Sequence, residues 1–146
     1  ECQRSRRFGA LLQAGDLDGI GELMRASHDG DRRFHGDEPF TVPTDDAALV
    51  ALAEQNAPLD LQPGAYACST ANIDRLVDIA NGVDGVVGAQ LAGAGLGGCM
   101  MTLVRAEAVQ ALEERFRQEY YAKLGREPDM HVCLPVAGAG LISLPE

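Results

Sequence analysis

Four glycines stand within six residues at positions 93–98, between two short apolar runs at 86–91 and 99–104. Glycine loses more backbone entropy on folding than any other residue, so four together indicate positive φ angles or a close backbone approach. The pattern predicts two neighbouring strands joined by a glycine loop. Such a loop either serves only as a tight turn or, through its successive N–H groups, forms a concavity that binds an anion.

Two common nucleotide-binding motifs do not fit this loop. Gly93, Gly95 and Gly98 have the G-x-G-x-x-G spacing of dinucleotide-binding folds. That motif requires a helix directly after its last glycine, whereas here an apolar run typical of a strand follows at 99–104. A Walker-type phosphate loop is excluded as well, because no Gly-Lys-Ser/Thr follows the glycines.

Upstream of the loop, apolar residues recur at helical spacing in four segments. Capping residues mark where these helices begin, and glycines mark where two of them end. The predicted helices are 5–14, stopped by Gly15; a second capped by Asp16; a third capped by Asp45; and a fourth capped by Ser69 or Thr70 and ended at Asn81-Gly82. Glycines 19 and 21 weaken the second helix by up to about 1 kcal/mol each relative to alanine, so that helix needs tertiary packing.

Downstream of the loop, the clearest predicted helix covers 106–122. A turn at 125–129 precedes a third predicted strand at 130–136, and residues 141–144 are a candidate for a fourth. Helices followed by strand, loop, strand, helix and strand predict an α+β domain with helices on one face of a small antiparallel sheet. A length of 146 residues fits one domain.

Charge is distributed unevenly along the chain. The net charge is −10, and residues 34–65 contain six acidic residues, four prolines and no Lys or Arg. This block is predicted to be a surface excursion with one short helix, either a solvated insertion or a flap that binds a partner. The net charge without a basic cluster argues against nucleic acids and anionic membranes as partners. No apolar run approaches the roughly 20 residues needed to span a bilayer.

The chain offers no convincing metal or nucleophile motif. Its four cysteines lack CxxC spacing and are expected to be reduced thiols in a cytoplasmic protein, because no signal peptide is visible. Ser27, His28 and Asp29 resemble a catalytic set in composition only, since consecutive residues of a helix point in different directions. We therefore expect no metal site and interpret this tripeptide as the polar end of a helix.

The segment GVVGAQLAGAGLGGCMMTLV resembles the third conserved motif of the GHMP small-molecule kinases, and most closely its galactokinase version, GARMTGGGFGGC. Three other segments are similar to galactokinases in the same order along the chain: GDLDGIGELMRASHDGDRRF, YACSTANIDRLVDIANGVDGVVGAQ and PDMHVCLPVAGAGLI. The resemblance covers nearly the whole chain except 34–65, which has the character of an insertion.

The resemblance implies that residues 1–146 are a single C-terminal domain with a ferredoxin-like antiparallel sheet. In the family, the sugar-binding motif, the Gly-Ser-rich phosphate loop and the catalytic Asp belong to an N-terminal domain, and none of them stands in this chain. We therefore expect no catalytic residue here, an inactive isolated chain, and an N-terminal kinase domain as its partner. The isolated domain is also expected to self-associate. ATP and Mg²⁺ would serve the parent enzyme, which would phosphorylate a sugar hydroxyl, the anomeric one.

The resemblance also assigns candidate site residues. The phosphate or active-site loop would be Gly93, Ala94, Gly95, Leu96, Gly97 and Gly98, and Ser27 and His28 would lie toward the domain interface. Gln90 and Ala92 replace the usual Arg and Thr, which removes side-chain donors, so an anion would be held mainly by backbone groups. Leu96 replaces an aromatic residue, consistent with a related sugar kinase. The alternative is a stand-alone, non-catalytic ligand-sensing or regulatory module of the same fold.

Overall fold

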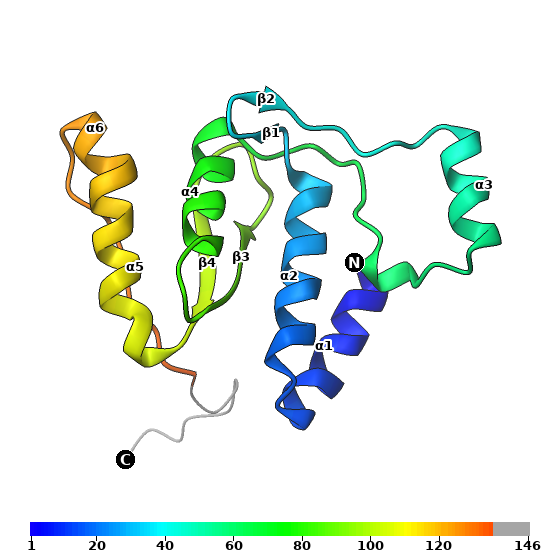
Figure 1. Cartoon of the computed structure of the whole chain (residues 1–146), viewed down its shortest axis with the longest axis horizontal. Helices are drawn as coiled ribbons and strands as arrows, with labels where there is room; N and C mark the ends of the chain where they lie inside the picture. The colour runs from blue at the N-terminus through cyan, green and yellow to red at the C-terminus, as the bar shows by residue number, and fades with distance from the viewer. Residues whose placement is uncertain (136–146) are drawn as a thin grey trace, which may run out of the picture.

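A hairpin of two antiparallel strands, β3 (Val86–Ala92) and β4 (Cys99–Val104), lies at the centre of the computed structural model, which describes residues 1–135 (Figure 1). Ala92 pairs with Cys99 at the loop end, and Val86 pairs with Val104 at the other end. A bulge leaves Val87 without a partner in β4. The prediction of two neighbouring strands joined by the glycine segment is confirmed.

Helix α2 (Leu17–Asp31) runs along β3 on the side that β4 leaves free. A Cβ atom on Gly21 would overlap the carbonyl oxygen of Val87, so the helix can approach the strand this closely only with glycine at that position. The cap predicted at Asp16 is confirmed, because its carboxylate accepts a hydrogen bond of 2.9 Å from the N–H of Gly19. Close packing on β3 thus supports a helix that its glycines weaken.

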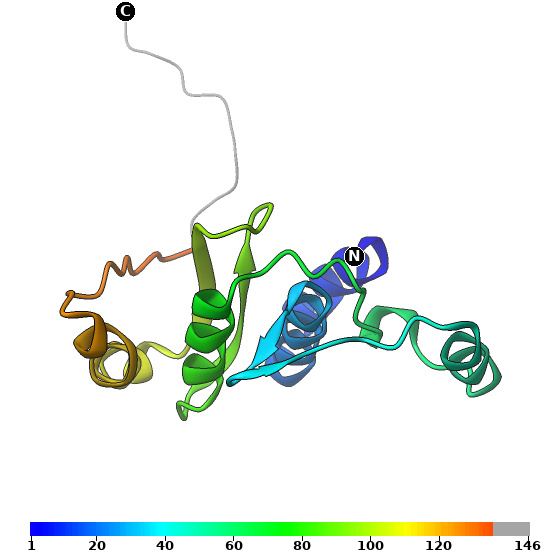
Figure 2. The same cartoon turned by 90° about the horizontal axis from the view of Figure 1, so that it is seen from above.

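Helix α4 (Ala71–Asn81) supplies much of the core and packs mainly on β3. Thr70 is its cap, since the hydroxyl accepts from the N–H of Ile73. The buried apolar cluster joins α4 to the hairpin and to α5 (Val109–Phe116), and consists of Cys68, Ile73, Leu76, Val77, Ile79, Ala80, Ala89, Leu91, Leu112 and Phe116. Figure 2 shows α4 lying between α5 on one side and α2 on the other.

Helix α1 (Cys2–Ala14) ends at Gly15, whose φ of 69° gives the predicted left-handed stop. Arg4 of α1 is buried and donates to the carbonyl oxygens of Asp60 and Gln62 at 3.2 and 2.8 Å. Arg7 pairs with the Asp60 carboxylate. These contacts attach the 3₁₀ turn η1 (Leu59–Leu61) to α1.

The block 34–65 contains the short helix predicted after Asp45, α3 (Asp46–Glu54). It also contains a minimal hairpin, β1 (Phe34–His35) with β2 (Glu38–Pro39), which the sequence pattern did not indicate. None of the residues of α3 is buried, and Figures 1 and 2 show the helix standing apart from the other helices.

The helix predicted over 106–122 is present but irregular. It consists of the 3₁₀ turn η2 (Ala106–Ala108), then α5, the π-helical turn η3 (Arg117–Tyr121) and α6 (Ala122–Leu124). Gly125, with φ 61°, ends it. None of the helices in residues 1–135 is long and apolar enough to cross a lipid bilayer.

The third strand predicted at 130–136 is wrong for residues 130–135, which form no strand. Val132 and Leu134 are 68% and 80% exposed. An alternating apolar pattern gives a strand only where a neighbouring edge supplies hydrogen bonds and a face buries the side chains. Residue 136 and the candidate fourth strand at 141–144 lie outside the described residues. The α+β class with antiparallel sheets is confirmed, with two strands in the main sheet of residues 1–135.

Candidate functional site

The glycine loop, residues 93–98, connects β3 to β4 and has an unusual backbone. Positive φ angles occur at Gly93 (80°), Gly95 (85°), Leu96 (64°), Gly97 (107°) and Gly98 (100°). Leu96 is 85% exposed although apolar, and the other loop residues are exposed or half-buried. A strand and no helix follows Gly98, so the geometry rules out a dinucleotide-binding motif.

The tip of the loop rests on Cys68, a buried residue just before α4. The N–H of Leu96 donates to the carbonyl oxygen of Cys68 at 2.7 Å. A Cβ atom on Gly95 would lie 2.6 Å from both the carbonyl oxygen and Sγ of Cys68. Gly95 is therefore required by close approach as well as by its φ angle.

The segment beneath the loop is in turn attached to the C-terminal end of α2. The N–H groups of Tyr66 and Ala67 both donate to the carbonyl oxygen of Gly30, at 2.8 and 3.1 Å. The N–H of Ser69 donates to the carbonyl oxygen of Asp31 at 2.8 Å. The last residues of α2 thereby support the segment on which the loop tip rests.

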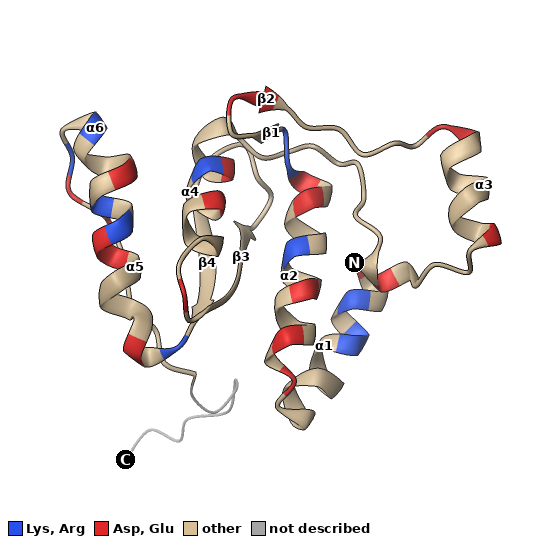
Figure 3. Cartoon of the chain, in the orientation of Figure 1, with Lys and Arg blue, Asp and Glu red and all other residues tan. Residues whose placement is uncertain are grey.

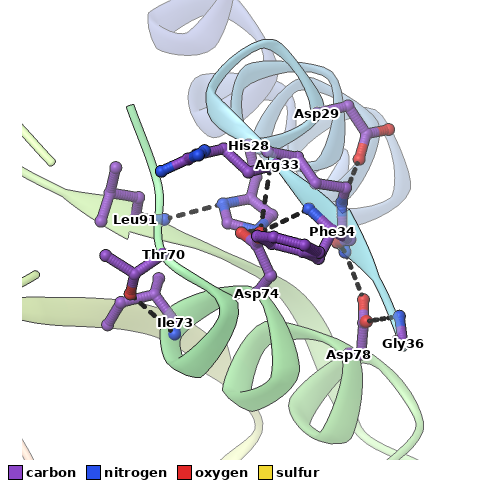
Figure 4. A network of polar contacts seen from close by, with 11 residues as sticks. His28, Asp29, Arg33, Phe34, Gly36, Thr70, Ile73, Asp74, Asp78 and Leu91 are labelled. Atoms are coloured by element: carbon purple, nitrogen blue, oxygen red, sulfur yellow. Dashed lines mark hydrogen bonds and ion pairs between the residues drawn. The ribbon is translucent and has the colours of Figure 1, made fainter. Parts of the chain in front are cut away.

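The other arm of the loop is held by His28, also in α2 (Figure 4). Its Nδ1 accepts a hydrogen bond of 3.2 Å from the N–H of Leu91, two residues before Gly93. Its Nε2 lies 3.3 Å from Oδ1 of Asp74 in α4, and both side chains are only 1% exposed. The second oxygen of Asp74 accepts from the N–H groups of Arg33 and Phe34, at 3.0 and 2.9 Å.

Burial determines the protonation of the two reactive side chains near the loop. Burial lowers the pKa of His28, and the nearby Arg32 guanidinium lowers it further, so the imidazole is kept neutral. Burial raises the pKa of the Cys68 thiol, and Asp31 adds to the effect. A thiol with a raised pKa is a poor nucleophile, so Cys68 acts here as a packing residue.

Arg32 forms a second polar centre at the end of α2. It is buried and pairs with Asp29 at 3.1 Å and Asp78 at 2.8 Å, while its guanidinium lies 5.8 Å from the centre of the Phe40 ring. A cavity of about 630 Å³ opens beside it, between α2 and α4. The two carboxylates already neutralise this cation, which indicates a structural role.

A second cavity, of about 680 Å³, lies at the other end of the strands from the glycine loop, beside Arg25, Asp84 and Arg105. Within the described residues, no three His, Cys, Asp or Glu side chains come together as a metal site would require.

The structure separates the two interface candidates. His28 faces the interior of the domain and is only 1% exposed, so it has almost no surface left with which to contact a partner domain. Ser27 is half-buried, and its hydroxyl donates to a carboxylate oxygen of Glu1 at 3.2 Å. Sequence reasoning missed Asp74, although a carboxylate next to the apolar stripe of a predicted helix was a usable signal.

Comparison with known protein families gives a match. The family model described as GHMP kinases C terminal matches residues 44–122. The match covers more than half of the chain and includes α3, α4, the hairpin and the whole glycine loop. It begins inside the acidic block, so residues 44–65 belong to the matched region.

Proposed function

Because residues 44–122 match the model of the GHMP kinase C-terminal domain, the chain belongs to the GHMP kinases, and we propose that it is the C-terminal domain of a sugar kinase similar to galactokinases. The parent enzyme would transfer the γ-phosphoryl group of ATP, with Mg²⁺, to a hydroxyl of a monosaccharide, the anomeric one. The glycine loop would form one wall of the active site.

The observation that carries this proposal is the two-sided character of the loop. On one side Gly95 and Leu96 are fastened to Cys68. On the other, a Cβ atom on Gly93, Gly97 or Gly98 would meet no atom within 4 Å, so the backbone there is open to a ligand. Backbone N–H groups in a fixed, exposed bend are suited to phosphate oxygens and need no cationic side chain.

The same loop lacks the other groups that phosphoryl transfer requires. Residues 76–104 contain no Lys or Arg, so this strand–loop–strand unit provides no cation to neutralise phosphate. Transfer also needs a bound Mg²⁺ and a group that positions the acceptor hydroxyl. We therefore propose that the catalytic groups come from an N-terminal kinase domain and that the isolated chain is inactive.

Exposed apolar side chains support a partner domain. Leu49 and Val50 of α3 are 51% and 54% exposed, and Leu96 projects from the loop tip. A helix that is apolar on all sides is normally buried. Figure 3 shows that only acidic charges flank α3, so its partner surface would be apolar with a basic rim.

A kinase assay tests the proposal. The full-length gene product and the isolated 146-residue chain are each incubated with ATP, Mg²⁺ and a panel of monosaccharides, and ADP release is followed. We expect turnover with at least one sugar for the full-length protein and none for the isolated chain. If the full-length protein bound a sugar without releasing ADP, the result would instead support a ligand-sensing module. Turnover by the isolated chain would overturn the proposal that the catalytic groups come from an N-terminal domain.

A further inference from the structure

We propose that His28 is a positioning residue for the glycine loop, which it holds by accepting a hydrogen bond from Leu91 while Asp74 fixes its tautomer. The inference rests on the proposed function only for the statement that the loop binds a ligand. The geometry that holds the loop comes from the contacts of His28, Asp74 and Leu91 alone.

The partners of the imidazole determine where its proton lies. The N–H of Leu91 donates to Nδ1, so Nδ1 carries no proton. The single proton of a neutral ring is then on Nε2, which lies 3.3 Å from Oδ1 of Asp74. Neither this nitrogen nor this oxygen makes a hydrogen bond of good geometry among the described residues, so the 3.3 Å contact between them is the polar interaction that the two buried atoms share.

Asp74 is fixed from its other side. Its Oδ2 accepts from two successive backbone N–H groups, those of Arg33 and Phe34. The carboxylate therefore cannot turn away from His28 without breaking both of these hydrogen bonds. Asp74 of α4, itself held by the N–H groups of Arg33 and Phe34, therefore keeps the His28 ring in one orientation.

The hold on Leu91 matters because of its place in the chain. One residue separates Leu91 from the first glycine of the loop, and Leu91 pairs with Met100 across the hairpin. The tip of the loop is held separately, through Cys68 and the carbonyl oxygens of Gly30 and Asp31. Both attachments lead back to residues 28–31 of α2, so this last turn of the helix sets the position of the whole loop.

The arrangement works only with a neutral imidazole. A proton on Nδ1 would face the N–H of Leu91, donor against donor, and the bond would break. The charged groups acting on His28 are Arg32, which disfavours the cation, and Asp74, Asp29 and Asp31, which favour it. Arg25 shares the adjoining cavity with the ring. Burial outweighs the three carboxylates, which keeps the acceptor available at neutral pH.

Two isosteric substitutions separate the two nitrogens. In His28→Asn the amide oxygen can take the place of Nδ1 and keep the acceptor for Leu91, but the side chain is too short to reach Asp74. In His28→Gln the amide NH₂ can take the place of Nε2 and keep the contact with Asp74, but no acceptor remains for Leu91. Loss of packing is larger in His28→Asn, which has one methylene fewer, so faster exchange in His28→Gln cannot come from packing and reports on the hydrogen bond to Leu91.

Hydrogen exchange followed by NMR or mass spectrometry tests the inference on the isolated chain. We expect His28→Gln to speed exchange at Leu91 and across 93–98 by about tenfold relative to His28→Asn, as loss of one buried hydrogen bond predicts. Equal exchange in the two variants would overturn the inference, because it would make His28 a packing residue only. If both variants unfold, Asp74→Asn, which keeps an acceptor toward Arg33 and Phe34, takes their place, with faster loop exchange again expected.

A kinetic readout then links the loop to catalysis. In the full-length protein, His28→Gln is expected to lower kcat/KM for ATP about tenfold more than His28→Asn does. Wild type should lose kcat/KM as the pH falls through the pKa of His28 in the folded protein, which burial places below the ordinary value for histidine. Absence of any kinase activity in wild type, with the exchange difference intact, would reject the proposed function and leave the positioning role standing. Unequal exchange with identical kinetics in the two variants would overturn the role of His28 in the reaction.

Discussion

Gly95 and Cys68 approach so closely that a methyl group on residue 95 would lie 2.6 Å from the carbonyl oxygen and the sulfur of Cys68. The same glycine has a φ of 85°, which is strained for any residue with a Cβ atom. Gly93, with a φ of 80°, shares the strain but would meet nothing within 4 Å. The two positions therefore separate backbone strain from steric overlap within one loop.

Gly93→Ala is expected to lower the free energy of unfolding by about 1–2 kcal/mol, through backbone strain alone. Gly95→Ala is expected to lower it by about 2–4 kcal/mol, because overpacking against Cys68 adds to that strain. Urea titrations of both variants measure the difference. Equal losses at the two positions would contradict the contact between the loop tip and Cys68.

Alanine substitutions at a second pair of glycines, Gly21 and Gly9, should change the free energy of unfolding in opposite directions. Gly21→Ala places a methyl group on the backbone carbonyl of Val87 and is expected to destabilise the domain by about 3 kcal/mol. Gly9→Ala, in the interior of α1 with nothing within 4 Å, is expected to stabilise it by up to about 1 kcal/mol through helix propensity. Thermal and urea unfolding measure both, and a neutral Gly21→Ala would argue against the close packing of α2 on β3.

The elements that the sequence predicted well are those whose signals are local. The caps at Asp16, Asp45 and Thr70, the stop at Gly15 and the hairpin around the glycine loop each depend on neighbouring residues. Hydrogen bonds between residues three to five positions apart form the caps and the stop, and a short loop joins the paired ends of the hairpin, so residue type alone indicates these features.

The features that the sequence did not predict depend on residues far apart in the chain. The sequence predicts only that His28 is a polar residue at the end of a helix. It becomes a buried hydrogen-bond acceptor because the N–H of Leu91 and the buried Asp74 lie beside its ring in the folded chain. The strand expected at 130–136 failed for the same reason, because a strand needs a partner edge that its own residues cannot specify. The alternation of Val132 and Leu134 indicated a buried face that residues 1–135 do not provide.

Acidification should destabilise the domain through His28. Its pKa in the folded protein lies below the ordinary value of about 6.5, so between the two values the unfolded chain binds a proton that the folded chain does not. The contribution of His28 to the free energy of unfolding is therefore complete above about pH 6.5 and is lost as the pH falls below it.

Urea midpoints between pH 8 and 5 measure this dependence. His28→Gln should flatten the decline below about pH 6.5. His131→Gln, at a residue whose ring is exposed to solvent, is the control and should leave the decline as in wild type. A decline unchanged by His28→Gln would show that other groups cause it.

The helix α3 should contribute to association and not to stability. Its residues are not buried, and Leu49 and Val50 expose about half of their surface, so Leu49→Lys should change the free energy of unfolding by no more than about 0.5 kcal/mol. The same substitution removes apolar contact area and is expected to reduce self-association of the isolated chain, measured by analytical ultracentrifugation over a range of protein concentrations. Asp46→Asn, in the same helix, removes a charge without changing its apolar side chains and is the matched control. If the wild-type chain stayed monomeric at the highest concentration, the expectation that α3 mediates association would be contradicted. The exposed apolar side chains of α3 would then be tolerated in water without a partner.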